Sequence, residues 1–284
     1  MPNADNRVVE DFGREWQLFD QSGLDEKEAI AAFDQYFLVF PWAAVPSNAE
    51  GFDLGCGSGR WARIMAPRVG RLHCIEPSEA IKVARRVLAE HSNVSFHQSY
   101  VDSIPLADAS MDFGYSLGVL HHVPDTPAGI RACVGKLKPG APFLLYLYYA
   151  FDNRPAWFRM LWRISDAARR VICRLPFLIK RIIASGIAMF IYWPLARVTK
   201  FVESRGSDVS SYPLSYYRDR SFYVMRTDSL DRFGTRIEKR FRREEILAMM
   251  EAAGLERIQF SPSAPYWCAV GYRSNTGATQ RAQS

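Results

Sequence analysis

Apolar positions between residues 51 and 148 follow two alternating spacings. Short runs typical of strands occur at 52–54, 71–76, 93–97, 111–117 and 141–149, and the last of them is continuously apolar. Apolar residues with helical spacing occur between these runs, at 61–68, 78–91 and 126–140. Strands that alternate with helices in this way predict βαβ units, which right-handed crossovers join into a parallel sheet with helices on both faces.

The alternation stops near Phe151 and resumes near residue 240. Residues 241–254 predict a helix closed by Gly254, and two strands at 256–261 and 266–272 follow. The whole pattern predicts an α/β fold: a Rossmann-like, mostly parallel seven-stranded sheet with one antiparallel strand at or near its edge and a helical insertion after strand five. The expected boundaries are 1–150 for the N-terminal helices and most of the core, 151–240 for the insertion, 241–273 for the rest of the core, and 274–284 for a disordered tail.

The composition fits this architecture and indicates the cellular compartment. Of the 284 residues 48% are hydrophobic, and the mean hydropathy of −0.15 is that of an ordinary globular protein. The five cysteines are scattered singly without a C-x-x-C pair, which argues against a zinc site and a disulfide framework. The N-terminal stretch is charged and holds no apolar run. We therefore expect no metal, no secretion signal and a cytoplasmic location.

A glycine-rich turn joins the first strand to the helix after it. Residues 53–59 are DLGCGSG, and glycines at such a turn let the backbone approach a ligand closely. Glu76 ends the second strand, 21 residues after Gly55. Doubly wound nucleotide-binding folds place there the carboxylate that accepts hydrogen bonds from both ribose hydroxyls.

The residues around this turn distinguish between two kinds of cofactor. A dinucleotide fingerprint requires a glycine where the chain has Arg60. Asp53 stands two residues before the first glycine of the turn, and a pyrophosphate disfavours a negative charge beside the helix N-terminus. S-adenosylmethionine carries an ammonium group and a sulfonium but no phosphate. The turn therefore favours S-adenosylmethionine and methyl transfer.

The chain resembles the class I S-adenosylmethionine-dependent methyltransferases, and among them the broad UbiE-like (methyltransferase type 11) set. The resemblance covers roughly residues 50–148 and 241–272. It depends on five segments in this order: FDLGCGSGR, CIEPS, SIPLADASMDFGYSLGVLHHVPDT, KLKPGAPFLL and FRREEILAMMEAAGLE.

The resemblance implies a set of cofactor-binding residues. It places the methionine part of the cofactor against Asp53, Gly55, Cys56, Gly57 and Gly59, and against Leu117 and Gly118 on the other side. It places the ribose at Glu76 and the adenine edge at the Val101 amide and the Asp102 carboxylate. Relatives often carry an acid where this chain has Tyr100.

Two histidines, His121 and His122, follow the fourth strand directly. Some relatives use a histidine at the position of His121 as a base near the acceptor, where an imidazole could remove a hydroxyl proton. The alternative is that both histidines only organise the loop, because many methyltransferases act by positioning alone. Residues 116–119 (SLGV) lack the Asp/Asn-Pro-Pro-Tyr/Phe motif of many enzymes that methylate exocyclic or amide nitrogens, which favours oxygen or carbon acceptors.

The insertion holds the basic charge of the chain. Residues 154–205 contain eleven basic and two acidic side chains, a net charge of +9, whereas the remainder carries −3. Its first helix is two-faced. One side carries Arg159, Arg163, Asp166, Arg170 and Arg174, and the other carries Trp157, Leu161, Ile164, Ala168, Val171 and Leu175. The uncharged run 182–196 is shorter than the roughly 20 residues of a transmembrane helix, so we expect none.

Three interpretations of the insertion remain open. It is a contact with an anionic membrane surface, a lid over the active site, or a helical cap or homodimer interface. Its many aliphatic residues disfavour nucleic-acid binding. Tyr217 and Arg218 lie outside any periodic element and are candidates for acceptor binding. Near the N-terminus, Phe12, Trp16 and Phe19 predict a helix that packs on the sheet.

Together these features predict a cytoplasmic methyltransferase, free or peripheral at the inner face of the membrane. Its cofactor is S-adenosylmethionine, and its acceptor is a small molecule, a glycan or a lipid-linked compound, methylated at oxygen. The alternatives are N- or C-methylation, or a non-catalytic protein of the membrane surface that retains the fold.

Overall fold

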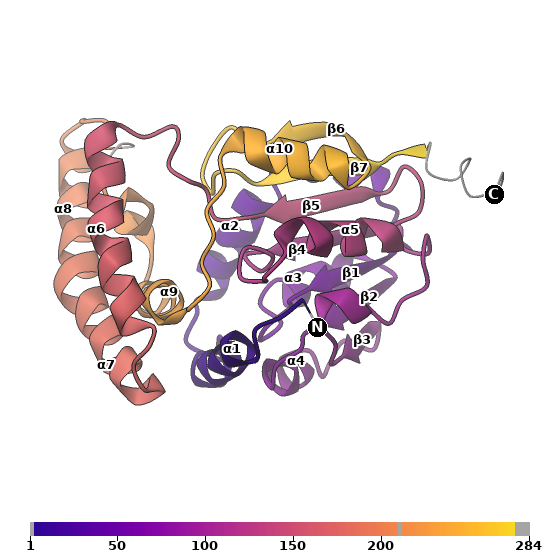
Figure 1. Ribbon diagram of the computed structural model, residues 1–284, viewed down its shortest axis with the longest axis horizontal. Helices are drawn as coiled ribbons and strands as arrows, with labels where there is room; N and C mark the ends of the chain where they lie inside the picture. Colours follow the sequence, from indigo (N-terminus) through magenta and orange to yellow (C-terminus); the bar gives the residue numbers. More distant parts are fainter. Residues whose placement is uncertain (1–2, 210–211, 276–284) are drawn as a thin grey trace. The chain divides into compact units, whose positions relative to one another are not determined.

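The computed structural model describes residues 3–209 and 212–275 of the chain, which form two compact units (Figure 1). Of the described residues, the sheet unit comprises 3–20, 29–150 and 239–275, and the helical unit comprises 21–28, 151–209 and 212–238. Of the predicted disordered tail, residues 276–284 lie outside the described part of the chain.

The sheet unit is built on one seven-stranded sheet with the order β3-β2-β1-β4-β5-β7-β6. The strands are β1 (Glu50–Leu54), β2 (Arg71–Ile75), β3 (Val94–His97), β4 (Phe113–Leu117), β5 (Pro142–Tyr146), β6 (Leu255–Phe260) and β7 (Ala269–Arg273). The first five are parallel, and β7 is antiparallel to both β5 and β6. The predicted mostly parallel, seven-stranded Rossmann-like sheet is thereby confirmed.

Helices cover both faces of this sheet (Figure 1). They are α1 (Asn6–Leu18), α2 (Glu26–Tyr36), α3 (Ala62–Met65), α4 (Ala80–Val87), α5 (Thr126–Lys136) and α10 (Arg243–Ala252). Single 3-10 turns lie at Trp42–Ala44, Ala66–Arg68 and Val101–Ser103. One apolar core joins α2, α3 and α4 to the strand face of Phe113 and Tyr115, and the other joins α5 and α10 to the face of Phe52. Alternate residues of a strand point to opposite faces, so both halves of each buried strand are apolar.

Within its described residues 151–209 and 212–238, the helical unit contains four helices and a 3-10 turn. They are α6 (Ala156–Ile172), α7 (Phe177–Ile187), α8 (Trp193–Ser204), α9 (Phe222–Gly234) and the turn Ser215–Asp219. A π-helical turn, Ala188–Tyr192, joins α7 to α8 without a break. Pro194 explains the wider turn, because it has no N–H to donate to the carbonyl of Phe190 and its ring crowds that carbonyl.

Residues 177–204 therefore form one helix of 28 residues, which is long and apolar enough to cross a membrane by length and composition alone. The sequence argument counted only the uncharged run 182–196 and concluded that the segment is too short. That argument was wrong about the length, because the helix continues through the basic residues at both ends of the run. Lys180, for example, turns its ammonium into the unit and donates to the Gly234 carbonyl at 3.1 Å.

Candidate active site

The site lies where the carboxyl ends of β1, β2 and β4 meet. The strand order runs outward in both directions from the β1–β4 pair, and open α/β sheets bind ligands in the crevice at such a reversal. Asp53 pairs in register with Cys74 of β2 on one side and Tyr115 of β4 on the other. The loops after these strands carry Gly55, Glu76 and Gly118.

The glycine turn adopts a backbone that needs its glycines. Gly55, Gly57 and Gly59 have φ of +75°, +54° and +84°, a left-handed region that other residues rarely adopt. A Cβ at Gly55 would lie 2.4 Å from Val119 Cγ2, so this position has no space for a side chain. The Gly55 amide donates to the Ile75 carbonyl at 2.7 Å, which holds the turn against the end of β2. Cys56 is a buried free thiol within the turn.

Asp53 has a buried carboxyl group, and its surroundings favour a cationic ligand. Burial raises its pKa to about 8, although the nearby Tyr115 hydroxyl opposes the shift. Among the described residues, its Oδ2 atom has no hydrogen-bond partner of good geometry. Such an atom is costly to bury unless a ligand satisfies it, and an ammonium group does so best.

Glu76 is held rigidly at the end of β2. Its Oε2 atom accepts from the Gly57 amide at 3.1 Å, and Oε1 accepts from the Ser78 amide at 3.0 Å and the Ser78 hydroxyl at 2.6 Å. Burial raises the pKa of Glu76, and these hydrogen bonds counter the shift. The carboxylate is therefore oriented next to the glycine turn, with lone pairs left for a diol.

The predicted adenine loop forms a 3-10 turn that is tied to the N-terminus. Val101 is buried, and the Asp102 Oδ2 atom accepts from the Asn3 amide at 2.9 Å. The Asn3 side chain also exchanges two hydrogen bonds of 2.7 Å with the Asp125 backbone. The Tyr100 hydroxyl, at the position where relatives often carry an acid, donates to Asn6 Oδ1 at 3.4 Å.

Helix α1 lies along the glycine turn, which sequence reasoning did not foresee. A Cβ at Gly57 would lie 3.1 Å from the Trp16 indole nitrogen, and the Phe12 ring is centred 4.9 Å from that of His122. Trp16 and Phe12 thus contact the site loops rather than only packing on the sheet. A groove of about 360 Å³ lies beside α1 and is lined by Val9, Glu10, Gly13, Arg14, Gln17, Pro77, Ser78, Glu79 and Gln98.

The loop after β4 leaves space on its glycine side. Gly118 has a φ of +77°, and a Cβ built on it would meet no atom within 4 Å. Leu117, just before it, is buried. Together with Asp53 and Glu76, this gap fits S-adenosylmethionine: an acid for the ammonium, an acid for the ribose and room beside the methionine chain.

His121 and His122 lie buried in the same loop. The His121 ring stacks on Tyr148 with centroids 3.8 Å apart, and the His122 ring is centred 3.9 Å away. Burial, with smaller effects of His122 and Arg240, lowers the pKa of His121 well below its usual range. Neither ring nitrogen of His121 has a hydrogen-bond partner within the described residues. At neutral pH this imidazole is uncharged, with a lone pair available.

A segment before α10 completes the surroundings of the histidines. The Lys239 amide donates to the His121 carbonyl at 3.2 Å, and its ammonium donates to the carbonyls of Val123, at 3.0 Å, and Pro124. The Arg240 guanidinium lies 5.0 Å from the Tyr148 ring centre. No motif marks these residues, because their contacts join segments about a hundred positions apart.

The two candidate acceptor residues lie in the helical unit. Arg218 pairs with Glu203 Oε2 at 2.7 Å and donates to the Ser215 carbonyl at 2.9 Å. Burial and the nearby Asp228 raise the pKa of the Tyr217 hydroxyl, whose ring is centred 5.1 Å from that of Tyr192. These contacts give both residues a structural part within that unit, and their contact with an acceptor stays a prediction.

Metal ligation has no support in the part of the chain that the structure describes. No group of three or more histidine, cysteine or acidic side chains is placed to hold an ion there. All five cysteines are free thiols.

Fold and site together define a class of protein: a doubly wound α/β domain whose first glycine turn is preceded by a buried acid. Comparison with known proteins identifies the class more closely. Residues 52–145, about a third of the chain, match the family model of the methyltransferase domain. This segment is therefore similar to the methyltransferase domain.

Curated relatives share this part of the chain. The ubiquinone biosynthesis O-methyltransferase of Xanthomonas axonopodis pv. citri is 35% identical over 103 residues, which cover 35% of this chain and 43% of that protein. The protein of the same name from Hahella chejuensis is 33% identical over 115 residues, covering 39% and 46%. The chain thus spans less than half the length of these relatives.

Solved structures share the fold over a longer stretch. A SAM dependent methyltransferase from Aquifex aeolicus superimposes with a TM-score of 0.50 at 13% identity, covering 92% of this chain and 96% of that one. A likeness at this level of identity concerns the architecture alone.

Proposed function

We propose that the protein transfers the methyl group of S-adenosylmethionine to an oxygen atom of a small-molecule, glycan or lipid-linked acceptor. One observation carries the proposal: a buried Asp53 whose Oδ2 atom has no partner among the described residues, placed directly before a glycine turn that is tied to Glu76. A dinucleotide would bring phosphates to this acid, whereas an amino-acid ammonium neutralises it.

Oxygen is the favoured acceptor atom for two reasons. The loop Ser116–Val119 lacks the nitrogen-methylating motif. The curated relatives, which match only part of this chain, bear the name of O-methyltransferases. Nitrogen or carbon acceptors are the alternatives, and methylation of a panel of phenols, amines and carbon acids with labelled cofactor distinguishes them.

Methyl transfer requires little of the protein beyond positioning the cofactor and the acceptor. The bound cofactor supplies an electrophilic methyl group for in-line displacement. Asp53 and Glu76 hold its two ends, and the glycine turn lets the backbone come close. His121 is suited to accept the hydroxyl proton of the acceptor, because its low pKa keeps its imidazole neutral at physiological pH.

Calorimetric titration with S-adenosylmethionine tests the proposal. We expect micromolar affinity (~10 µM) that Asp53→Ala and Glu76→Ala each reduce about 10- to 100-fold, because each variant removes a charged hydrogen-bonding partner. Asp108→Ala is the matched control, since Asp108 is an exposed acid of the same unit that pairs with Lys136. Binding of a dinucleotide in place of S-adenosylmethionine would contradict the proposal.

A further inference from the structure

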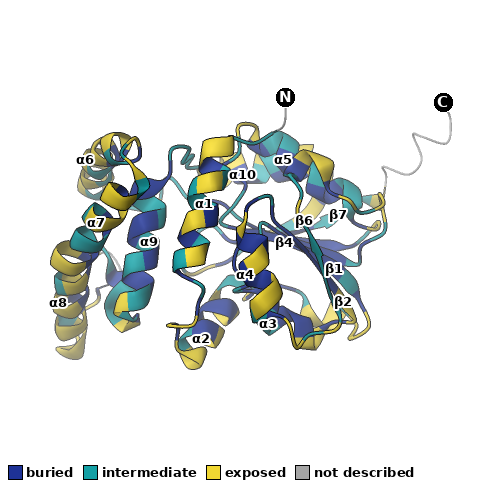
Figure 2. Ribbon diagram, turned by 90° about the horizontal axis from the view of Figure 1, so that it is seen from below, coloured by how far each residue is buried: buried dark blue, intermediate teal, exposed yellow. Residues whose placement is uncertain are grey.

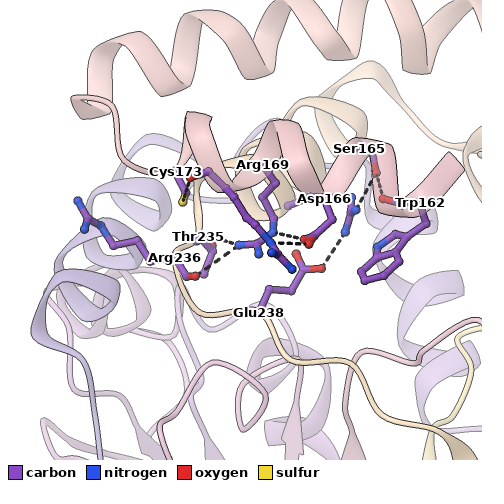
Figure 3. Close-up of polar contacts among 10 residues, drawn as sticks. Trp162, Ser165, Asp166, Arg169, Cys173, Thr235, Arg236 and Glu238 are labelled. Atoms are coloured by element: carbon purple, nitrogen blue, oxygen red, sulfur yellow. Dashed lines mark hydrogen bonds and ion pairs between the residues drawn. The ribbon is translucent and has the colours of Figure 1, made fainter. Parts of the chain in front are cut away.

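Helix α6 buries charged residues and exposes large apolar ones, which is the reverse of an ordinary amphipathic helix. Its buried positions are charged: Arg169 Nε pairs with Asp166 Oδ1 at 2.7 Å, and the same guanidinium donates to the Thr235 carbonyl at 2.9 Å (Figure 3). Next to them, Arg232 pairs with Glu238 at 2.8 Å and donates to Ser165 Oγ at 3.0 Å. Hydrogen bonds from Arg169 to the Thr235 carbonyl and from Arg232 to Ser165 Oγ thus join α6 to the rest of the helical unit, with a buried ion pair on the α6 side of the contact.

Five large apolar residues of α6 lie on its exposed side instead. Trp157, Met160, Leu161, Ile164 and Val171 are all exposed, Ile164 by 62%. A surface helix of a globular protein normally buries its apolar stripe and exposes its charges. An exposed stripe with a buried ion pair beneath it indicates that the stripe meets something apolar outside the unit.

The helix 177–204 shows the same inversion. Its buried residues are three alanines together with Lys180, Tyr192 and Thr199. The Ser229 hydroxyl of α9 donates to the Ala184 carbonyl at 2.9 Å. Its outward residues are large: Ile182, Met189, Phe190, Trp193 and Phe201 are exposed, Phe190 by 74%. The π-helical turn brings Met189, Phe190 and Ile191 outward in succession.

Exposed apolar side chains concentrate on these two helices. Of the twenty large apolar side chains that are exposed among the described residues, fifteen lie between Trp157 and Phe201. The exposed colour covers the corresponding faces of α6, α7 and α8 in Figure 2. Scattered exposed apolar residues are normal, but a concentration of this kind marks an interaction surface.

The charged residues on the same helices indicate which kind of partner fits this surface. Arg159, Arg163, Arg174 and Arg181 are exposed. In the described ranges 3–209 and 212–275, no carboxylate lies within ion-pair distance of any of the four. An apolar face that carries unpaired arginines complements a surface with apolar depth and anionic headgroups, which is an anionic lipid bilayer.

We infer that the outward faces of α6 and of the helix 177–204, named here the docking surface, bind the protein to anionic membranes. The helix lies in the plane of the interface rather than across the bilayer. Its other face packs on α9, which carries Asp228, Asp231 and Arg232, and such charges do not enter hydrocarbon. The inference stands independently of methyl transfer. If both hold, the enzyme is peripheral at the inner membrane face and meets lipid-linked acceptors there.

Flotation with lipid vesicles tests the docking surface. The full chain should float with phosphatidylcholine vesicles that contain phosphatidylglycerol, much less with phosphatidylcholine alone, and should be released by high salt. Arg159→Glu/Arg163→Glu should weaken binding at least about tenfold, and Ile182→Glu/Phe190→Glu should abolish it. The matched controls, Arg86→Glu and Leu38→Glu, change exposed residues of the sheet unit and should bind as the unchanged protein does.

Three outcomes would overturn the inference. The first is no flotation with anionic vesicles at low salt, or equal losses in the controls. The second is retention of the protein in membranes through high salt and alkaline carbonate, which would mean that the helix spans. The third is a lipid-independent dimer in sedimentation velocity that Phe190→Glu dissociates, which would make the surface a subunit interface. S-adenosylmethionine affinity, measured on every variant, reports folding and separates failure of docking from failure of the proposed function.

Discussion

At the residue scale, the ionisation of Asp53 is coupled to ligand binding. In the ligand-free protein burial holds its pKa near 8, so the carboxyl group is mostly protonated at pH 7. An ammonium ligand favours the charged form and lowers that pKa. Binding is therefore coupled to release of the proton, in the direction that strengthens affinity as the pH rises toward 8.

The proton release is measurable. At pH 7 we expect S-adenosylmethionine binding to release up to about one proton, seen as different calorimetric enthalpies in phosphate and Tris buffers. Asp53→Asn should remove the release and most of the affinity gain between pH 6 and 8. Above pH 8 the affinity should fall again, because the α-amino group of the ligand, with an ordinary pKa of about 8, loses its own charge. An unchanged release in Asp53→Asn would rule out this role.

His121 offers a second test at the same scale. If it accepts the acceptor proton, His121→Ala should lower the turnover rate with saturating acceptor by about 10²- to 10⁴-fold and leave cofactor affinity nearly unchanged. Because the pKa of His121 lies well below its usual range, the imidazole stays neutral from pH 8 down to pH 6, and its protonation should not lower the turnover rate in that interval. Full turnover in His121→Ala would assign the residue to loop packing with Tyr148.

Gly118 tests where the cofactor lies. Gly118→Ala and Gly140→Ala impose nearly the same backbone penalty, of about 1–2 kcal/mol, because their φ angles are +77° and +79°. Neither new methyl group would meet a protein atom closer than 3.9 Å. Only Gly118→Ala should weaken S-adenosylmethionine binding in a titration, because its methyl enters the space beside Leu117. Equal affinities in the two variants would move the cofactor elsewhere.

At the scale of elements, α1 acts on the glycine turn through Trp16. The indole lies against Gly57, so removing it should loosen the turn in the ligand-free protein. We expect Trp16→Ala to speed amide hydrogen exchange in residues 55–59. Trp157→Ala, at an exposed tryptophan of α6, should leave these amides unchanged. Equal exchange in both variants would reduce α1 to a helix that merely packs on the sheet.

For the whole molecule, docking and catalysis combine in a kinetic prediction. With an acceptor carried in anionic vesicles, Arg159→Glu/Arg163→Glu should raise KM at least about tenfold and leave kcat unchanged, since only the local concentration of enzyme at the lipid changes. With a short-chain, water-soluble form of the same acceptor, both constants should stay as in the unchanged protein. A loss of kcat with the soluble acceptor would place these arginines in catalysis instead.

The amino-acid sequence by itself determined the order of strands and helices, the glycine turn and the acid 21 residues after Gly55. These features depend on local periodicity and on backbone geometry that only certain residues adopt, so they can be read from neighbouring positions. The antiparallel strand near the edge followed from the same pattern.

Only the tertiary structure decided which side chains of the insertion are buried within the helical unit, and which residues surround the site. The periodicity of α6 identified an apolar and a basic side, but the hydrogen bonds that hold the buried Arg169 join it to the carbonyls of Thr235 and Arg236, 66 and 67 positions away. The approach of Asn3, Trp16 and Lys239 to the site loops has the same origin. Long-range contacts leave no local pattern, and the pKa of Asp53 depends on burial that exists only when the whole sheet is assembled.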